Sequence, residues 1–142
     1  MEFLKKTKIK EVMASPAITV NENDDFSKVH EKFELYDIRH LPVVNDNGGL
    51  VGLITQRELF KIHSPHRLED GGWFYDKELL NGFILKNVMF TDVFSLKPDH
   101  FLYEAVEYMV KHKFGCIPIV DDYKFVQGII TRDDILKYLL IK

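Results

Sequence analysis

The internal repeat is the feature that most restricts how this chain can fold. A shift of 76 residues aligns two copies without a gap, so that Lys10-Glu11-Val12-Met13 falls on Lys86-Asn87-Val88-Met89. The same shift aligns Leu41-Pro42-Val43-Val44 with Ile117-Pro118-Ile119-Val120, and Gly52-Leu53-Ile54-Thr55 with Gly128-Ile129-Ile130-Thr131. Few aligned positions are identical, but the apolar positions agree in register. The pattern therefore indicates two copies of one structural unit.

Each copy is predicted to begin with a short turn and a strand, which in the first copy covers residues 17–20. A helix follows, with Phe26, Val29 and Phe33 on one face and Asp24 or Asp25 as its N-cap. In the second copy the matching face carries Leu102, Ala105, Val106 and Met109. This apolar spacing is typical of a helix with one buried side.

Two strands and a second helix complete each predicted copy. The strands cover residues 40–44 and 50–54, then 116–120 and 125–130. Asn47-Gly48 favours a hairpin turn in the first copy because both residues tolerate positive φ. The closing helices are expected to start at Thr55 and Thr131. The fold class is therefore α/β (α+β), built from two β-α-β-β-α units.

Composition restricts the function. The 142 residues carry a formal net charge of −3, and the basic residues are scattered, so we expect neither nucleic-acid binding nor anionic-membrane binding. No run approaches the roughly 18 apolar residues of a membrane helix. Cys116 is the single cysteine, which excludes an internal disulfide and fits a cytoplasmic protein. We expect Cys116 to lie on a buried strand, where a nucleophilic role is not expected.

Each copy ends in a motif that permits two interpretations. Thr55 precedes Glu58, and Thr131 precedes Asp134, by three residues at the start of a predicted helix. A Thr-x-x-acid pattern is the capping box, in which both side chains bond backbone N–H groups. The same groups could hold the sugar and phosphate of a nucleotide, since helix N-termini attract anions and carboxylates accept ribose hydroxyls. The spacing alone does not decide between a cap and a ligand site.

The order of these landmarks strongly resembles the cystathionine-β-synthase (CBS) domain, present here as a tandem pair known as a Bateman module. The resemblance rests on Val-Met, the Pro-containing strand and the Gly-h-h-Thr-x-x-acid ending, where h is apolar, in both copies. It implies two pseudo-symmetric CBS units packed as one module: the first CBS unit at residues 1–62, a linker at 63–84 and the second CBS unit at 85–142. It also implies ligand clefts between the units and pairing of two modules into a homodimer.

The resemblance further implies which residues bind an adenosine-containing ligand such as AMP, ADP, ATP or S-adenosylmethionine. In members that bind such ligands, the Thr and acid contact ribose or phosphate, and the opposite copy's first strand contacts adenine. One expected site consists of Thr131, Asp134, Arg132, Ala17, Ile18, Ile38, Arg39 and His40. A weaker second site consists of Thr55, Glu58, Val93, Phe94, Phe114, Gly115 and Cys116, because Glu replaces Asp and bases are missing.

The expected function is that of a non-catalytic regulatory module that binds an adenosyl ligand and acts on a partner protein in trans. The alternative is a dimerisation or interaction scaffold that binds no nucleotide, with the Thr and acid serving only as caps. An enzyme is not expected, because no hydrolase elbow, Walker loop or zincin helix is found. No required cofactor is expected. His63-x-x-His66 is not expected to bind metal, and Trp73-Phe74-Tyr75 is expected to pack on the module or a partner.

Overall fold

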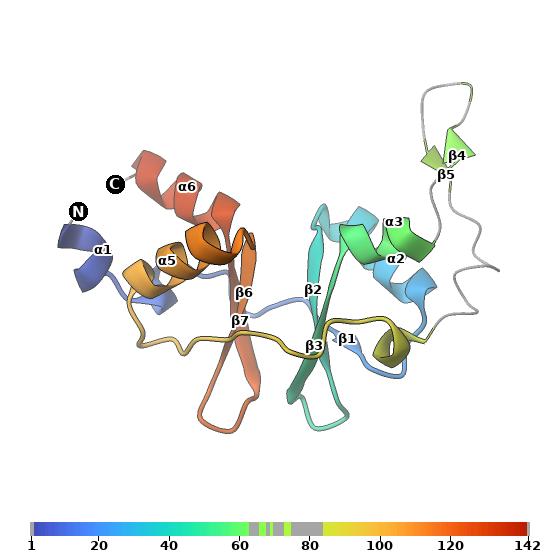
Figure 1. Ribbon diagram of the computed structural model, residues 1–142, viewed down its shortest axis with the longest axis horizontal. Coiled ribbons are helices and arrows are strands. Elements are labelled where there is room, and N and C mark those ends of the chain that lie inside the picture. The colour runs from blue at the N-terminus through green and yellow to red at the C-terminus, as the bar shows by residue number, and fades with distance from the viewer. Residues whose placement is uncertain (1, 63–65, 68, 70–72, 75–83, 142) are drawn as a thin grey trace. The chain divides into compact units, whose positions relative to one another are not determined.

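The apolar patterns of the two repeats form helices packed on strand hairpins, in two units that Figure 1 shows as ribbons. The computed structural model describes residues 2–62, 66–67, 69, 73–74 and 84–141. Unit 1 contains Met1–Ile18, Gly48–Leu50 and Phe94–Lys142, and unit 2 contains Thr19–Asn47 and Val51–Val93. The mixed α/β fold with two repeated β-α-β-β-α motifs is the one that the sequence predicts.

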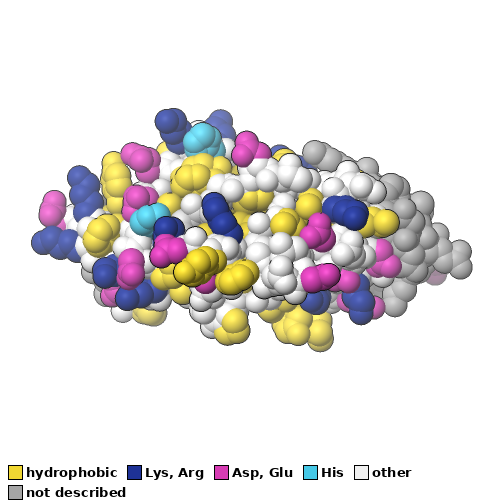
Figure 2. All heavy atoms as spheres, turned by 90° about the horizontal axis from the view of Figure 1, so that it is seen from below, with side chains coloured by type: hydrophobic (Ala, Val, Ile, Leu, Met, Phe, Trp, Pro, Cys, Tyr) yellow, Lys and Arg dark blue, Asp and Glu magenta, His cyan; other side chains and the backbone are white. Residues whose placement is uncertain are grey.

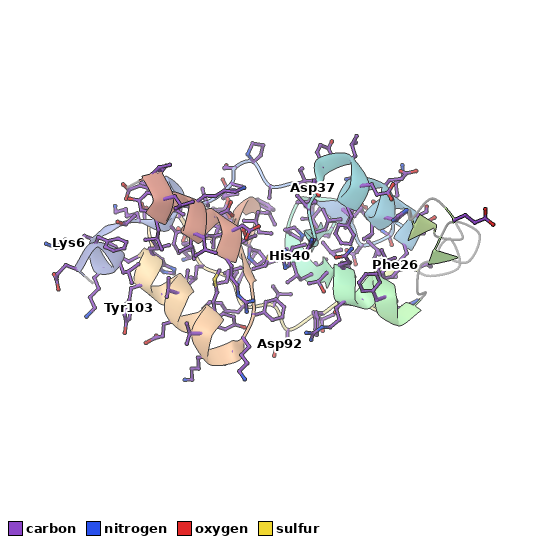
Figure 3. The ribbon with its side chains drawn as sticks, turned by 90° about the horizontal axis from the view of Figure 1, so that it is seen from above. Lys6, Phe26, Asp37, His40, Asp92 and Tyr103 are labelled. Atoms are coloured by element: carbon purple, nitrogen blue, oxygen red, sulfur yellow. The ribbon has the colours of Figure 1, made fainter. Side chains whose placement is uncertain are left out.

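Unit 2 is built on a three-stranded sheet. The short β1 (Val20–Asn21) runs parallel to β2 (His40–Val44), and β2 lies between β1 and β3 (Leu50–Thr55). Helices α2 (Phe26–Tyr36) and α3 (Gln56–Ile62) lie on the same side of this sheet (Figure 1). Figure 3 shows Phe26 between the two helices, and its side chain is fully buried.

The capping of α2 follows from its sequence. Asp25 is the N-cap, and its Oδ1 accepts hydrogen bonds from the backbone N–H groups of Ser27 at 3.0 Å and Lys28 at 3.4 Å. Asp37 ends the helix in the left-handed region at φ 53°. The matching Lys113 adopts φ 55° at the end of α5, so both repeats end this helix in the same way.

Unit 1 repeats this arrangement with a two-stranded hairpin. Strands β6 (Cys116–Val120) and β7 (Val126–Thr131) are antiparallel. Helices α5 (Leu102–His112) and α6 (Arg132–Ile141) both lie on one side of this hairpin (Figure 1). The core is apolar and consists of Ile9, Leu96, Leu102, Ala105, Met109, Ile117, Ile119, Ile130 and Ile135. Helix α1 (Glu2–Lys6) packs against α5.

The remaining described elements are short. Two single-turn 3-10 helices are formed by η1 (Ile9–Glu11) and η2 (Leu85–Asn87). Strands β4 (His66–Arg67) and β5 (Trp73–Phe74) form a separate antiparallel pair. In the described part of the chain, no helix combines the length and the apolar character needed to cross a membrane.

The compact units differ from the sequence repeats in their leading segments, which are exchanged. Ala14, from the first repeat, forms two backbone hydrogen bonds with Ile129, from the second, at 2.8 and 3.0 Å. Phe90, from the second repeat, forms two with Leu53, from the first, both at 3.0 Å. Each unit therefore joins the Val-Met segment of one repeat to the strands and helices of the other.

Glycine makes this exchange possible. A β-carbon on Gly128 would lie 2.6 Å from the carbonyl oxygen of Ala14, closer than real β-carbons approach other atoms. A β-carbon on Gly52 would lie 2.9 Å from the carbonyl oxygen of Phe90. The glycine of the Gly-h-h-Thr motif is thus needed because another backbone crosses directly over it.

The predicted elements agree with the structure except at the first strand. The expected strand at residues 17–20 is wrong in extent, because β1 covers only Val20–Asn21. The segment before it is instead held at Ala14 by the bonds to Ile129, and only the last residues reach β2. Asp25, rather than Asp24, caps α2; Asp24 accepts from the Asn21 N–H at 3.1 Å.

Candidate functional site

The Thr131–Asp134 motif lies where β7 ends and α6 begins. The backbone N–H and the Oγ1 of Thr131 both donate to Oδ2 of Asp134, each at 2.9 Å. In return, the backbone N–H of Asp134 donates to Thr131 Oγ1 at 3.2 Å. This is a complete capping box, and its three bonds use only one of the two carboxylate oxygens.

The Thr55–Glu58 motif occupies the same place between β3 and α3, but its bonding differs. The Thr55 N–H donates to Glu58 Oε2 at 2.7 Å, and Thr55 Oγ1 donates to the same oxygen. Thr55 Oγ1 accepts from the N–H of Arg57 at 3.2 Å, whereas Thr131 Oγ1 accepts from the N–H of the acid itself. Glu58 is only 4% exposed, whereas Asp134 is half-buried.

The second carboxylate oxygen of Glu58 is a buried acceptor. Its Oε1 has no hydrogen-bond partner within the described part of the chain. A buried polar atom without a partner costs about 1–3 kcal/mol, more if it is charged. The longer acid therefore reaches a more enclosed position than Asp134, and one of its oxygens is buried without a hydrogen bond from the described residues.

Residues just before each Pro-containing strand contact the motif of the same unit. The Arg132 N–H donates to the Gly115 carbonyl at 3.0 Å, and the Gln56 N–H donates to the Arg39 carbonyl at 3.0 Å. Cys116 pairs with Thr131 across β6 and β7. Burial raises the pKa of the Cys116 thiol far above its usual range, and the nearby negative charge of Asp134 adds to the rise. The thiol is therefore a poor nucleophile.

The two units divide the predicted site residues as follows. Unit 1 holds Thr131, Arg132, Asp134, Ala17, Ile18, Phe94, Phe114, Gly115 and Cys116. Unit 2 holds Thr55, Glu58, Val93, Ile38, Arg39 and His40, and Figure 3 shows His40 at the start of its strand β2. In unit 2, the Arg39 carbonyl accepts a hydrogen bond from Gln56, the residue that follows Thr55. In the same way, Gly115 and Cys116 adjoin Thr131 and Asp134.

Phe94 has a packing role that sequence reasoning missed. Its ring stacks on Tyr108 of α5 with centroids 3.8 Å apart and planes 7° from parallel, and the Tyr108 ring lies 4.4 Å from that of His112. The spacing of Tyr108 and His112 at i and i+4 on α5 was the sequence signal for this column. One face of the Phe94 ring is therefore already covered within unit 1.

Two predictions fall wholly or partly outside the described residues. His63, Tyr75 and the side chains of His66, Trp73 and Phe74 are not described, so neither the metal question at His63-x-x-His66 nor the packing of the three aromatics is tested. Elsewhere, in the ranges that the structure describes, no group of three His, Cys, Asp or Glu side chains is placed to hold a metal ion.

The fold and these motifs define a tandem pair of the same small α/β module. The model of the CBS domain family matches residues 9–64 and 85–141. The chain belongs to the CBS domain family and forms a CBS pair, or Bateman module.

Solved structures and curated proteins of this family resemble the chain over nearly its whole length. The crystal structure of AcuB from Vibrio cholerae is 30% identical with a TM-score of 0.78, over 94% of this chain and 90% of that one. The CBS domain pair of protein MJ0100, in complex with 5-methylthioadenosine and S-adenosyl-L-methionine, is 26% identical with a TM-score of 0.77, over 94% and 95%.

An enzyme is among the similar proteins. The inosine-5'-monophosphate dehydrogenase of Methanocaldococcus jannaschii is 35% identical over 130 residues, which is 92% of this chain but 23% of the enzyme. The chain spans between about a fifth and a third of the length of the first curated relatives that it matches. The likeness to named enzymes is therefore a likeness to their CBS portion.

Proposed function

We propose that the chain is a non-catalytic regulatory module that binds an adenosine-containing ligand, in the class of AMP, ADP, ATP or S-adenosylmethionine. Binding stabilises one arrangement of the module, and the module then acts on a partner protein in trans. A ligand shifts such an equilibrium only by its different affinities for the two states. The proposal places the protein in the cytoplasm and requires neither a cofactor nor nucleic acid.

The observation that carries the proposal is the Thr131–Asp134 motif in its unit. Its hydrogen bonds use Oδ2 and leave the cap complete without Oδ1, so the carboxylate can serve as a cap and still accept a ribose hydroxyl. Ala17 and Ile18, proposed to contact adenine, are half-buried residues of the same unit. A relative of 26% identity that covers nearly all of the chain is a CBS pair in complex with two adenosyl compounds.

A thermal-shift panel of AMP, ADP, ATP, NAD and S-adenosylmethionine, with and without magnesium, tests the proposal. A ligand present at 100 times its dissociation constant stabilises the folded state by about 2.7 kcal/mol. For a domain of this size, the midpoint of unfolding rises by roughly 5–10 °C. A rise of this size for an adenosyl compound supports the proposal, and a flat panel with all five compounds contradicts it.

A second candidate is a scaffold that dimerises and binds no nucleotide. The favouring observation is the outer surface of α6, where Leu136, Leu139, Leu140 and Ile141 are 41–85% exposed. Figure 2 shows that apolar side chains also reach the surface on the face it presents, among interspersed acidic and basic ones. Apolar side chains gathered on one helix favour an interface with another protein.

Light scattering at micromolar concentration tests whether the chain forms the dimer that the scaffold candidate requires. We expect a homodimer in the absence of ligand, and Leu140→Glu, which places a charge on the exposed apolar surface of α6, should reduce the mass to that of a monomer. A wild-type protein that is monomeric throughout would contradict the homodimer. An equally dimeric Leu140→Glu variant would exclude α6 as the interface.

A further inference from the structure

The methionines of the two Val-Met segments lie directly against the motif glycines, one in each unit. A β-carbon on Gly52 would lie 2.3 Å from Sδ of Met89 and 2.8 Å from its Cγ. A β-carbon on Gly128 would lie 3.0 Å from Sδ of Met13 and 3.4 Å from its Cγ. In both units, the thioether therefore occupies the space that a side chain on the glycine would need.

Met13 and Met89 differ from the methionine of the core in their access to solvent. Both residues are half-buried, whereas Met109 of α5 is only 5% exposed. Met13 packs against the outside of the unit 1 core, of which Met109 is a buried member. Because a thioether must meet the oxidant in order to be oxidised, a peroxide in solution reaches Met13 and Met89 more readily than Met109.

The backbone beside each sulfur is already committed to the crossing of the leading segment over the strand. In unit 1, the N–H groups of Ala14 and Ile129 donate to each other's carbonyl oxygens at 2.8 and 3.0 Å. In unit 2, Phe90 and Leu53 form the same two bonds, both at 3.0 Å. The methionine immediately precedes Ala14 in one unit and Phe90 in the other. A polar group added at either sulfur would therefore lie close to donors that the crossing needs.

Oxidation turns the apolar thioether into a polar group of this kind. In the two-electron reaction, the sulfur takes one oxygen atom from hydrogen peroxide, the O–O bond breaks, and the peroxide is reduced to water. The sulfoxide oxygen is a hydrogen-bond acceptor, so it either competes for the N–H groups of the crossing or draws the side chain off the glycine and into solvent. Both outcomes remove packing that holds the leading segment on the strand.

We propose that Met13 and Met89 act as two peroxide-sensitive latches, which hold the leading segments on the motif strands when reduced and loosen them when oxidised. Each motif glycine lies three residues before Thr131 or Thr55, so a loosened crossing also weakens the strand that positions the Thr-x-x-acid motif. Methionine sulfoxide is returned to the thioether by its reductases, which makes the change reversible. This regulation goes beyond ligand binding and does not depend on it.

The test is treatment of the full chain with hydrogen peroxide, with the oxidised residues located by peptide mass spectrometry. Met13 and Met89 should become sulfoxides while Met109 remains reduced. The midpoint of thermal unfolding should fall by roughly 5 °C. Hydrogen exchange at the Ile129 and Leu53 amides should accelerate about tenfold. Incubation with the two methionine sulfoxide reductases, one for each epimer, should restore both values.

Met13→Leu combined with Met89→Leu is the matched variant. Leucine has a similar volume and is well tolerated in place of methionine, and it carries no sulfur to oxidise. The double variant keeps Met1, Met109 and Cys116, so any effect of peroxide at those residues remains in it. Its midpoint of unfolding and its hydrogen exchange should be the same before and after peroxide.

Four results would each overturn the latches. They are an equal fall of the midpoint in the wild type and the double variant, an unchanged midpoint with Met13 and Met89 fully oxidised, oxidation of Met109 as fast as theirs, and a fall that the reductases do not reverse. The first would place the damage at another residue, and the last would show an irreversible lesion. None of them bears on ligand binding, which the thermal-shift panel tests separately.

Discussion

The two units solve the same structural problem with acids of different length, and the comparison shows what one methylene group changes. In unit 1, Asp134 is half-buried and completes a reciprocal capping box with Thr131. In unit 2, Glu58 is buried, its Oε2 takes both bonds from Thr55, and Oε1 has no partner in the described residues. The shorter acid gives a reciprocal capping box, and the longer acid gives a cap in which one carboxylate oxygen is buried and unpaired among the described residues.

The largest expected effects come from the equivalent core positions Phe26 and Leu102, both fully buried. Phe26→Ala should lower the free energy of unfolding by about 3–5 kcal/mol and Leu102→Ala by about 2–5 kcal/mol, because each leaves a cavity. Urea denaturation followed by circular dichroism measures both. Hydrogen exchange should show lost protection first in β2 and β3 for Phe26→Ala, and in β6 and β7 for Leu102→Ala. Equal losses in both units would contradict their separate cores.

The motif glycines give the next largest effect. Gly128→Ala pushes a β-carbon against the Ala14 carbonyl, and Gly52→Ala pushes one against Met89 and the Phe90 carbonyl. Overpacking of this kind costs about 1–3 kcal/mol, and Gly128→Ala should cost more because the rigid carbonyl oxygen lies closer there, at 2.6 Å against 2.9 Å at Gly52, whereas a methionine side chain can move. Gly115→Ala is the control, since the three atoms nearest to its new β-carbon belong to the Arg132 side chain and lie at ordinary contact distance. Chemical denaturation that ranks Gly115→Ala with the other two would refute the crossing of backbones.

The threonine caps should differ between the units. Thr131→Ala removes a cap and should cost about 1 kcal/mol. Thr55→Ala should cost more, about 2 kcal/mol, because it also removes the hydroxyl donor from the buried Glu58 carboxylate. The midpoints of thermal unfolding of the two variants, measured side by side, check this order. A greater loss for Thr131→Ala would contradict the contrast between the two acids.

The smallest expected effect concerns the ion pair of Lys10 with Asp99 in unit 1, which unit 2 replaces with a contact between a lysine and an uncharged asparagine. Lys10 and Lys8 hold the pKa of Asp99 below its ordinary value, chiefly through the hydrogen bond from Lys10. At the matching positions, Lys86 Nζ lies 3.4 Å from the amide oxygen of Asn23. Because the pKa of Asp99 is lowered in the folded state, the contribution to stability is present above the unfolded pKa and is lost as pH falls through the folded one.

Asp99→Asn gives unit 1 the lysine–asparagine contact of unit 2 and tests whether the ion pair contributes to stability. The variant should show a shallower loss of stability under acid than the wild type, and added salt should reduce the gap because the pair is exposed. Thermal unfolding across the acid range at two salt concentrations is the measurement. A wild-type curve that matches the variant at low salt would show that the pair contributes nothing.

The sequence predicts the elements well because each repeat carries its own periodicity and caps. The bounds of β2 and β6 are as expected, and the buried face of α2 is formed by Phe26, Val29 and Phe33. The exchange of leading segments could not be predicted from the pattern alone, because Val12-Met13 and Val88-Met89 are near-equivalent and fit either set of strands. The backbone hydrogen bonds of Ala14 and Phe90, and the close approach at Gly52 and Gly128, show which segment crosses which strand.

The candidate site was predictable in its residue types but less so in its geometry. The Thr-x-x-acid spacing predicts a capping box, and the structure has it in full only at Thr131–Asp134. The burial of Glu58 depends on packing of the surrounding core, which spacing does not encode. The Arg132 side chain lies 3.4 Å from the place of a β-carbon on Gly115. These two residues are 17 positions apart, and the sequence offers no local signal for their contact.

Isothermal titration of the adenosyl compound that gives the largest thermal shift, into wild-type protein and Asp134→Ala, tests the central claim most directly. The account predicts measurable binding to the wild type and its loss at the Thr131 site in Asp134→Ala, with the variant still folded by circular dichroism. Unchanged affinity and stoichiometry in a folded Asp134→Ala would contradict the assignment and leave the Thr131–Asp134 motif as a helix cap alone.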